Sequence, residues 1–117
     1  MRYKIEEVET SKVHEEAVTY GIPKSNMASI LGVSEKTFYN IMQKTHLDRE
    51  RSDRFHFIDQ ILQSGKEAFG SEKNFSAWMK TSQPTLEGNK PLDMLTSITG
   101  ANKVLQLLGR IKHGITA

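Results

Sequence analysis

The sequence predicts an all-α protein in which a small N-terminal helical module packs on a C-terminal helical domain. Apolar residues recur at spacings of three and four through most of the 117-residue chain, which is the helical period. Glycines and prolines fall between these periodic segments, where helices would end or begin. The alternation typical of strands is confined to Tyr3-Lys4-Ile5. With 37% hydrophobic and 26% charged residues, the chain has the composition of a folded protein with one modest core.

The first helix is expected after a short arm. Residues 1–10 carry little periodicity, so we expect them to form a loose arm. Ser11 is a residue type that caps helices, because its side chain can accept a hydrogen bond from a free backbone N–H. The helix would run to about Tyr20 and stop at Gly21, which tolerates the left-handed conformation of a helix end.

The next two helices form the most specific local pattern. Pro23 suits the entry to a helix that ends at Gly32, where a sharp turn needs a positive φ. Ser34 caps a third helix through about Lys44. The apolar residues that would form the small core shared by the two helices are Met27, Leu31, Val33, Phe38 and Ile41, with the small Ala28 at the close crossing. The pattern resembles the helix-turn-helix of phage-repressor-like transcription factors, although an ordinary helical hairpin with a glycine turn remains the alternative.

In a DNA-binding helix-turn-helix, the second helix enters the major groove and its outward side chains read the bases. Asn40 can pair with adenine, Lys36 can donate to guanine, and Glu35 can accept from cytosine or simply favour the helix N-terminus. The full set of predicted DNA-binding residues is Lys24, Ser34, Glu35, Lys36, Thr37, Tyr39, Asn40, Gln43 and Lys44. The alternative for each is a polar residue on a solvated helix face. One such helix reads few base pairs, so we expect a homodimer on a palindromic operator.

Further helices are expected beyond residue 50. Asp48 or Ser52 would open a long fourth helix, whose apolar Phe55, Ile58 and Leu62 form either an intramolecular core or a dimer seam. We expect a domain boundary near residue 50, with a helix-turn-helix module over 1–50 and a second helical domain over 51–117.

The remaining helices are predicted from the same kinds of start and stop residues. Ser71 would start a fifth helix, in which Trp78 is either a core residue or an interface anchor. Residues 81–89 are polar and predict a loop. Pro91 would begin a short helix that Gly100 breaks, and a last helix would carry four apolar residues before ending at Gly114: Val104, Leu107, Leu108 and Ile111.

The C-terminal half carries a second resemblance. Its motifs, in order, are a tryptophan on a helix, a Pro-Leu-Gly loop, Pro91-Leu92-Asp93-Met94-Leu95, and a terminal Leu-Gly-Arg-Ile-x-x-Gly-Ile run. With the helix-turn-helix included, residues 12–117 resemble the Xre/ParS-type antitoxins that partner RES-domain toxins. The family often has two glycines in the loop, where this chain has Glu87-Gly88, and asparagine before the loop proline, where it has Gln83. Since one glycine suffices for one residue with a positive φ, we expect the loop to keep the conformation that is typical of the family.

The resemblance implies a division of labour. The C-terminal domain would mediate dimerisation and bind the toxin, and the end of the chain would block the mouth of the toxin's NAD pocket. The matching positions are Arg110, Lys112, His113, Gly114, Ile115, Thr116 and Ala117. The planar fork of Arg110 suits carboxylates at an interface. The alternatives are a plain C-cap at Gly114 and cations that favour a helix C-terminus at Arg110 and His113.

No catalytic constellation is present in the sequence. The four histidines are scattered, there is no cysteine, and no glycine-rich phosphate loop occurs. We therefore expect neither enzymatic activity nor a metal or cofactor. No apolar run approaches the roughly 18 residues of a membrane span, and no signal peptide is recognisable, so a cytoplasmic protein without membrane contact is expected.

The expected function is therefore that of an antitoxin. It would neutralise an NAD-degrading RES-domain toxin and repress its own operon through the helix-turn-helix. The first alternative is a free-standing dimeric transcriptional repressor without a toxin partner. The second is a protein-interaction module whose helix-turn-helix no longer binds DNA.

Overall fold

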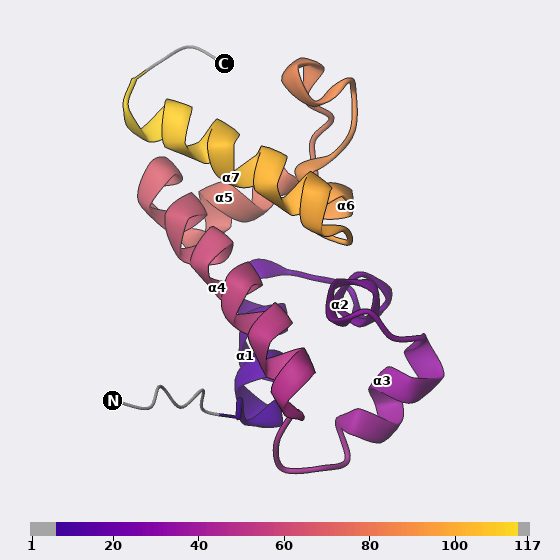
Figure 1. The fold of residues 1–117 in the computed structure, drawn as a ribbon. Coiled ribbons are helices and arrows are strands. Elements are labelled where there is room, and N and C mark those ends of the chain that lie inside the picture. Colours follow the sequence, from indigo (N-terminus) through magenta and orange to yellow (C-terminus); the bar gives the residue numbers. More distant parts are fainter. Residues whose placement is uncertain (1–6, 115–117) are drawn as a thin grey trace, which may run out of the picture.

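The computed structural model of the chain describes residues 7–114 and is all-helical, as predicted. Within the described residues, β-type pairing is limited to one isolated bridge between Glu9 and His46. Figure 1 shows α1, α2 and α3 in the lower half and α5, α6 and α7 in the upper half, with α4 running between them. The elements are α1 (Thr10–Tyr20), α2 (Lys24–Leu31), α3 (Glu35–Ile41), α4 (Arg49–Phe69), α5 (Glu72–Met79), the 3-10 helix η1 (Pro84–Leu86), α6 (Pro91–Met94) and α7 (Ile98–Lys112).

The expectation of a loose arm over residues 1–10 is wrong for its last residues. Val8 is buried, its N–H donates to Ser52 Oγ at 2.9 Å, and its carbonyl accepts from Leu47 N–H at 2.8 Å. Thr10 N–H donates to Thr45 O at 3.0 Å. The segment before α1 is thereby held against the segment that leads into α4. Residues 1–6 lie outside the described part of the chain.

Helix α1 begins earlier than predicted. Its N-cap is Glu9, and Ser11 lies inside the first turn, where its hydroxyl donates to Glu9 Oε2 at 3.3 Å. Backbone pairing of Thr10 with Thr45 fixes the entry to the helix and replaces a side-chain cap. The predicted stop at Gly21 is confirmed, because Gly21 adopts the left-handed conformation with φ 65°.

Helix α4 begins at the earlier of its two predicted starts. Asp48 is the N-cap and accepts from Arg51 N–H at 2.8 Å, whereas Ser52 is buried within the first turns. Phe55, Ile58 and Leu62 are buried inside the single chain, so they belong to its intramolecular core rather than to a seam between copies. Helix α4 packs against α2, α5 and α7, and so joins both halves of the molecule. The domain boundary near residue 50 stays a prediction.

A ring cluster fixes the crossing of α4 and α5. A Cβ atom at Gly65 would overlap the ring of Phe75, so the ring lies directly on the α4 backbone. Phe75 also packs edge-on against Tyr20, with ring centroids 6.1 Å apart, and stacks on Phe69 and Trp78 at 6.0 and 5.9 Å. Trp78 is half-buried and packs against the core. Three helices therefore meet at one phenylalanine.

Two expectations about the C-terminal half are wrong. Gly100 does not break a helix but lies in the first turn of α7, because Ser97 caps that helix by accepting from Gly100 N–H at 3.0 Å. A Cβ at Gly100 would clash with the Met94 carbonyl, so glycine permits the tight corner between α6 and α7. In the loop, Glu87 as well as Gly88 has a positive φ, of 57° and 81°. The loop needs two such residues, not one.

Glu16 is a buried carboxylic acid at the packing of α1. Its side chain is 9% exposed, its Oε2 has no hydrogen-bond partner among residues 7–114, and Lys12 Nζ lies 3.9 Å from its Oε1. Burial, and after it the nearby Asp59 carboxylate, raise the pKa of Glu16 to about 7. The fold therefore favours the neutral acid.

Replacing Gly65 by alanine should destabilise the fold by about 1–3 kcal/mol, because the added methyl displaces Phe75. The matched control is Gly109→Ala in α7, where a Cβ would meet open space. That change should raise the free energy of unfolding by about 0.5–1 kcal/mol through helix propensity. Urea unfolding measures both values. A Gly65→Ala variant as stable as the wild type would contradict the ring contact.

The Glu16→Gln variant should differ from the wild type only at higher pH. Since the folded-state pKa of Glu16 is raised, its stabilising contribution is full below pH 4.5 and is lost as pH rises through about 7. We expect the variant to match the wild type at pH 4 and to be more stable at pH 8, by on the order of 1 kcal/mol. Thermal melts across this range measure the difference, and the exposed Glu7→Gln serves as the control. Equal stability offsets at both pH values would refute the raised pKa.

Candidate functional sites

The α2–α3 corner is built by local hydrogen bonds and one contact from α4. Gly32 has φ 77°, and Val33 N–H donates to Ala28 O at 3.0 Å, which closes the turn. Arg54 Nε donates to the Ile30 carbonyl at 3.0 Å, so α4 holds the C-terminal end of α2. The predicted stop at Gly32 and the predicted cap at Ser34 are confirmed. Ser34 Oγ accepts from Thr37 N–H at 3.1 Å.

Helix α3 is shorter than expected. It ends at Ile41 rather than near Lys44, because Gln43 N–H and Lys44 N–H donate to the carbonyls three residues before them, in tight turns. Pro23 likewise stands just before α2 as its N-cap, not inside the first turn. Both shifts are local and leave the corner between the two helices intact.

All nine predicted DNA-binding side chains are exposed on α2, α3 and the turn that follows them: Lys24, Ser34, Glu35, Lys36, Thr37, Tyr39, Asn40, Gln43 and Lys44. Tyr39 is 65% exposed. Ser34 and Thr37 also hydrogen-bond each other at 3.1 Å between their hydroxyl oxygens, so both take part in the cap of α3. Glu35 is in the first turn, where an acidic side chain favours the helix dipole. Contact of any of these residues with DNA stays a prediction.

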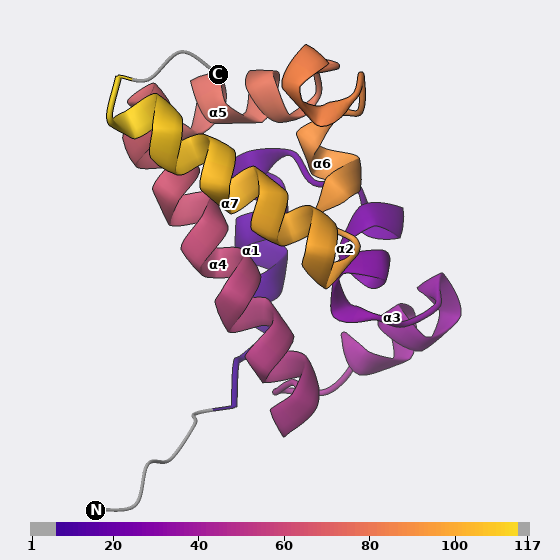
Figure 2. The same ribbon diagram turned by 45° about the horizontal axis from the view of Figure 1, so that its top comes forward.

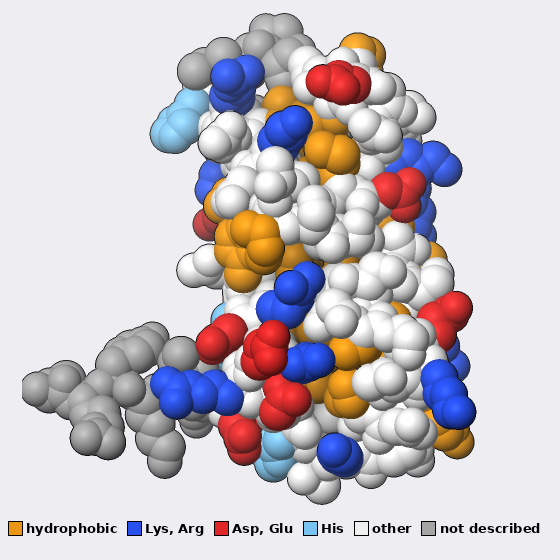
Figure 3. All heavy atoms as spheres, turned by 45° about the vertical axis from the view of Figure 1, so that its right-hand side comes forward, with side chains coloured by type: hydrophobic (Ala, Val, Ile, Leu, Met, Phe, Trp, Pro, Cys, Tyr) orange, Lys and Arg blue, Asp and Glu red, His pale blue; other side chains and the backbone are white. Residues whose placement is uncertain are grey.

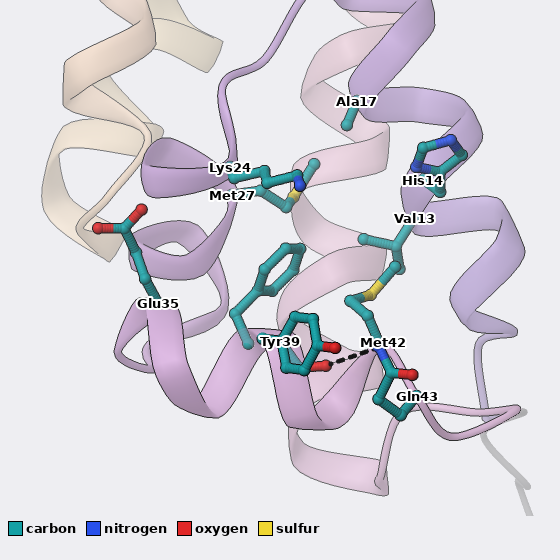
Figure 4. A pocket seen from close by; sticks show the side chains of 10 residues that line it. Val13, His14, Ala17, Lys24, Met27, Glu35, Tyr39, Met42 and Gln43 are labelled. Atoms are coloured by element: carbon teal, nitrogen blue, oxygen red, sulfur yellow. Dashed lines mark hydrogen bonds between the residues drawn. The ribbon is translucent and has the colours of Figure 1, made fainter.

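Four of these side chains surround a hollow that sequence reasoning missed. Lys24, Glu35, Tyr39 and Gln43 lie on the rim of a cavity of about 300 Å³ between α1, α2 and α3, as Figure 4 shows. The other residues that line it are Val13, His14, Ala17, Met27, Phe38 and Met42. No sequence signal marks this cavity, because its walls come from three separate helices.

The surface carries no uniform charge on the side shown in Figure 3, where acidic and basic side chains are interspersed. This agrees with the small net charge of +2. Binding of a nucleic acid would therefore depend on placed contacts rather than on bulk electrostatic attraction.

The predicted toxin-binding residues extend from the last turn of α7. Arg110, Lys112, His113 and Gly114 are exposed, and Lys112 Nζ lies 3.4 Å from Glu67 Oε1 of α4. Gly114 has φ 73°, as a helix-terminating glycine does. The predicted contacts of Ile115, Thr116 and Ala117 fall outside the described residues.

A second hollow adjoins Arg110. A groove of about 130 Å³ lies between α7 and the η1 loop, and its lining residues are Thr85, Leu86, Lys103, Gln106, Leu107 and Arg110. Sequence reasoning singled out Arg110 but not Lys103 or Gln106. Helical spacing could have found them, because both precede Arg110 on one face of the helix.

Within residues 7–114, no group of three or more His, Asp or Glu side chains is arranged to hold a metal ion. None of the helices in this range is long and apolar enough to cross a membrane.

Comparison with known proteins identifies the C-terminal half. Residues 64–114 match the family described as the antitoxin Xre/MbcA/ParS C-terminal toxin-binding domain. Antitoxin Xre of Yersinia enterocolitica is 29% identical over 98 residues, which cover 80% of this chain and 65% of that protein. The chain thus spans slightly less than two thirds of the length of this curated relative.

The fold has a solved counterpart. A chain of the M. tuberculosis MbcT–MbcA toxin–antitoxin complex superimposes with a TM-score of 0.68 at 17% identity, over 92% of this chain and 96% of that one. The C-terminal half of the present chain is thus similar in sequence to the toxin-binding domain of Xre/MbcA/ParS antitoxins, and its fold is similar to that of a chain from a toxin–antitoxin complex.

Proposed function

We propose that this chain is the antitoxin of a RES-domain, NAD-degrading toxin, and that it inhibits the toxin by placing its C-terminal tail at the mouth of the NAD pocket. The observation that carries the proposal is the match of residues 64–114 to an antitoxin toxin-binding domain. In the structure this range comprises the end of α4, the α5 helix, the η1 loop, α6 and α7. The resemblance between the terminal Leu-Gly-Arg-Ile-x-x-Gly-Ile run and the RES-partnering antitoxins supports the choice of toxin.

The exposed cations at the end of α7 support this proposal. Helix α7 packs along α4, and its last turn presents Arg110, Lys112 and His113 to solvent. The cations of the last turn would bind acidic or carbonyl groups at the rim of the toxin's pocket.

The N-terminal module would supply operator binding. We propose that α3 enters the major groove, that two copies form a dimer, and that the operator is palindromic. The support is the closed α2–α3 corner, the cap at Ser34, and the exposed face that carries Lys36 and Asn40. In both Figures 1 and 2 this helix lies away from the C-terminal end of α7, so the two binding functions would not compete for surface. The expected compartment is the cytoplasm, where both operator and NAD are found.

A chain that ends at Lys112 tests occlusion, because it keeps α7 whole and removes only residues 113–117. It should still bind the toxin but should no longer block NAD consumption at saturation. The measurement is NAD loss by purified toxin, titrated with the full chain or the shortened chain. Full inhibition by the shortened chain would refute occlusion by the tail. Absence of any complex with the full chain would refute the antitoxin proposal and leave a free-standing repressor.

Replacing Asn40 or Lys36 by alanine should weaken operator binding by about 1–3 kcal/mol for each base that the side chain no longer reaches. Toxin binding should not change. The measurement is a mobility shift on the promoter DNA of the operon. The matched control is Lys73→Ala, which removes an exposed lysine from α5. If the Asn40→Ala and Lys36→Ala variants both bind the operator as tightly as the wild type, the assignment of these residues to base contacts is wrong.

A further inference from the structure

The groove between α7 and the η1 loop is a second partner-binding surface. We propose that it receives an acidic side chain of the toxin, which is bound between Lys103 and Arg110. This inference depends on the proposed function, since it names a further contact with the same partner. It extends that contact from the tail back along α7 to Lys103 and the loop.

Helix geometry places the polar wall of the groove on one face. Gln106 and Arg110 follow Lys103 by three and seven residues, a spacing that aligns side chains along an α-helix. Leu86 and Leu107, which are 6% and 5% exposed, also line the groove and supply its apolar part. The groove is thus a small hollow with two leucines in its lining and a cationic wall on α7.

Neither cation of the groove is neutralised by an acidic side chain of the described residues, which is also true of several other surface cations. Within residues 7–114, neither Lys103 nor Arg110 forms an ion pair. By contrast, Lys66 pairs with Glu72 at 3.3 Å, and Lys112 pairs with Glu67 at 3.4 Å. Two unpaired cations beside one hollow favour an anion there, and the Gln106 amide can donate a further hydrogen bond.

The loop that forms the other wall is ordered before any partner binds. Gln83 N–H donates to Asn89 O at 3.0 Å, Gly88 N–H donates to Gln83 O at 2.9 Å, and the Asn89 side chain donates to Leu86 O at 3.0 Å. The positive φ of Glu87 and Gly88 gives the loop its tight return. A wall that is already ordered costs little conformational entropy on binding.

The position of the groove favours a protein ligand over DNA. In Figure 1 the orange loop that contains η1 lies at the top of the molecule and α3 at the lower right, so DNA bound along α3 would lie away from the groove. The groove also continues into the last turn of α7, so a toxin that receives the tail would pass over it.

The test uses charge reversal in the full chain. Lys103→Glu and Arg110→Glu are compared with Arg49→Glu, which reverses an exposed cation at the far end of α4. Affinity for the purified toxin is measured at low and high salt. We expect each groove variant to bind about tenfold or more weakly at low salt, with a smaller difference at high salt, while the control binds like the wild type. Inhibition of NAD loss at saturation should be retained in Lys103→Glu.

The outcomes separate the two proposals. Toxin binding by the wild type with unchanged affinity in both groove variants would overturn the groove but leave the antitoxin function. No toxin binding by the wild type would overturn both. Unchanged toxin affinity with weakened affinity for operator DNA would assign the groove to nucleic acid and overturn its role toward the toxin. Equal losses in the groove variants and in the control would show a general charge effect and would also overturn it. Circular-dichroism melts verify that each variant folds.

Discussion

The contact between Phe75 and the bare backbone at Gly65 is the constraint on which the rest of the packing depends. Glycine inside a long helix costs about 1 kcal/mol of helix propensity. The Phe75 ring occupies the space that a Cβ at Gly65 would fill, and so holds α5 against α4. Its edge contact with Tyr20 holds α1 against both helices. With α5 fixed, the other faces of α4 remain for α2 and α7, which carry the two candidate binding surfaces.

Local chemistry predicted much of this fold, and tertiary contacts account for the errors. The stop at Gly21 and the cap at Ser34 follow from residue type and could be found by reading the sequence. The true start of α1 could not, because backbone pairing of Thr10 with Thr45 across 35 residues decides it. The role of Gly100 could not be predicted for a similar reason. The Met94 carbonyl leaves no room for a Cβ atom at this position, and no helix ends there.

Some features of the candidate sites could likewise be predicted from the sequence, and others could not. The exposed face of α3 could be predicted, because a helix of known register shows which side chains point outward. The groove beside Arg110 could not be found as a hollow, because η1 and α7 supply opposite walls from separate segments. The loop also differs from expectation, since Glu87 adopts the left-handed conformation that the family often gives to a second glycine. Burial at Glu16 is likewise invisible in a sequence where the neighbouring Glu15 is exposed.

Helix α4 has a mechanical consequence. It runs without interruption for 21 residues, a length of about 31 Å, and packs against helices of both halves. The part of the molecule that holds the candidate recognition helix and the part that holds α7 are thus connected by one continuous helix and not by a flexible linker. In a dimer joined through the C-terminal domains, as the resemblance implies, the length of α4 would contribute to the distance between the two recognition helices. Binding of the second recognition helix to its half-site would then cost no linker entropy. The effective concentration for this second contact would depend on how well the spacing of the two helices matches the spacing of the two half-sites.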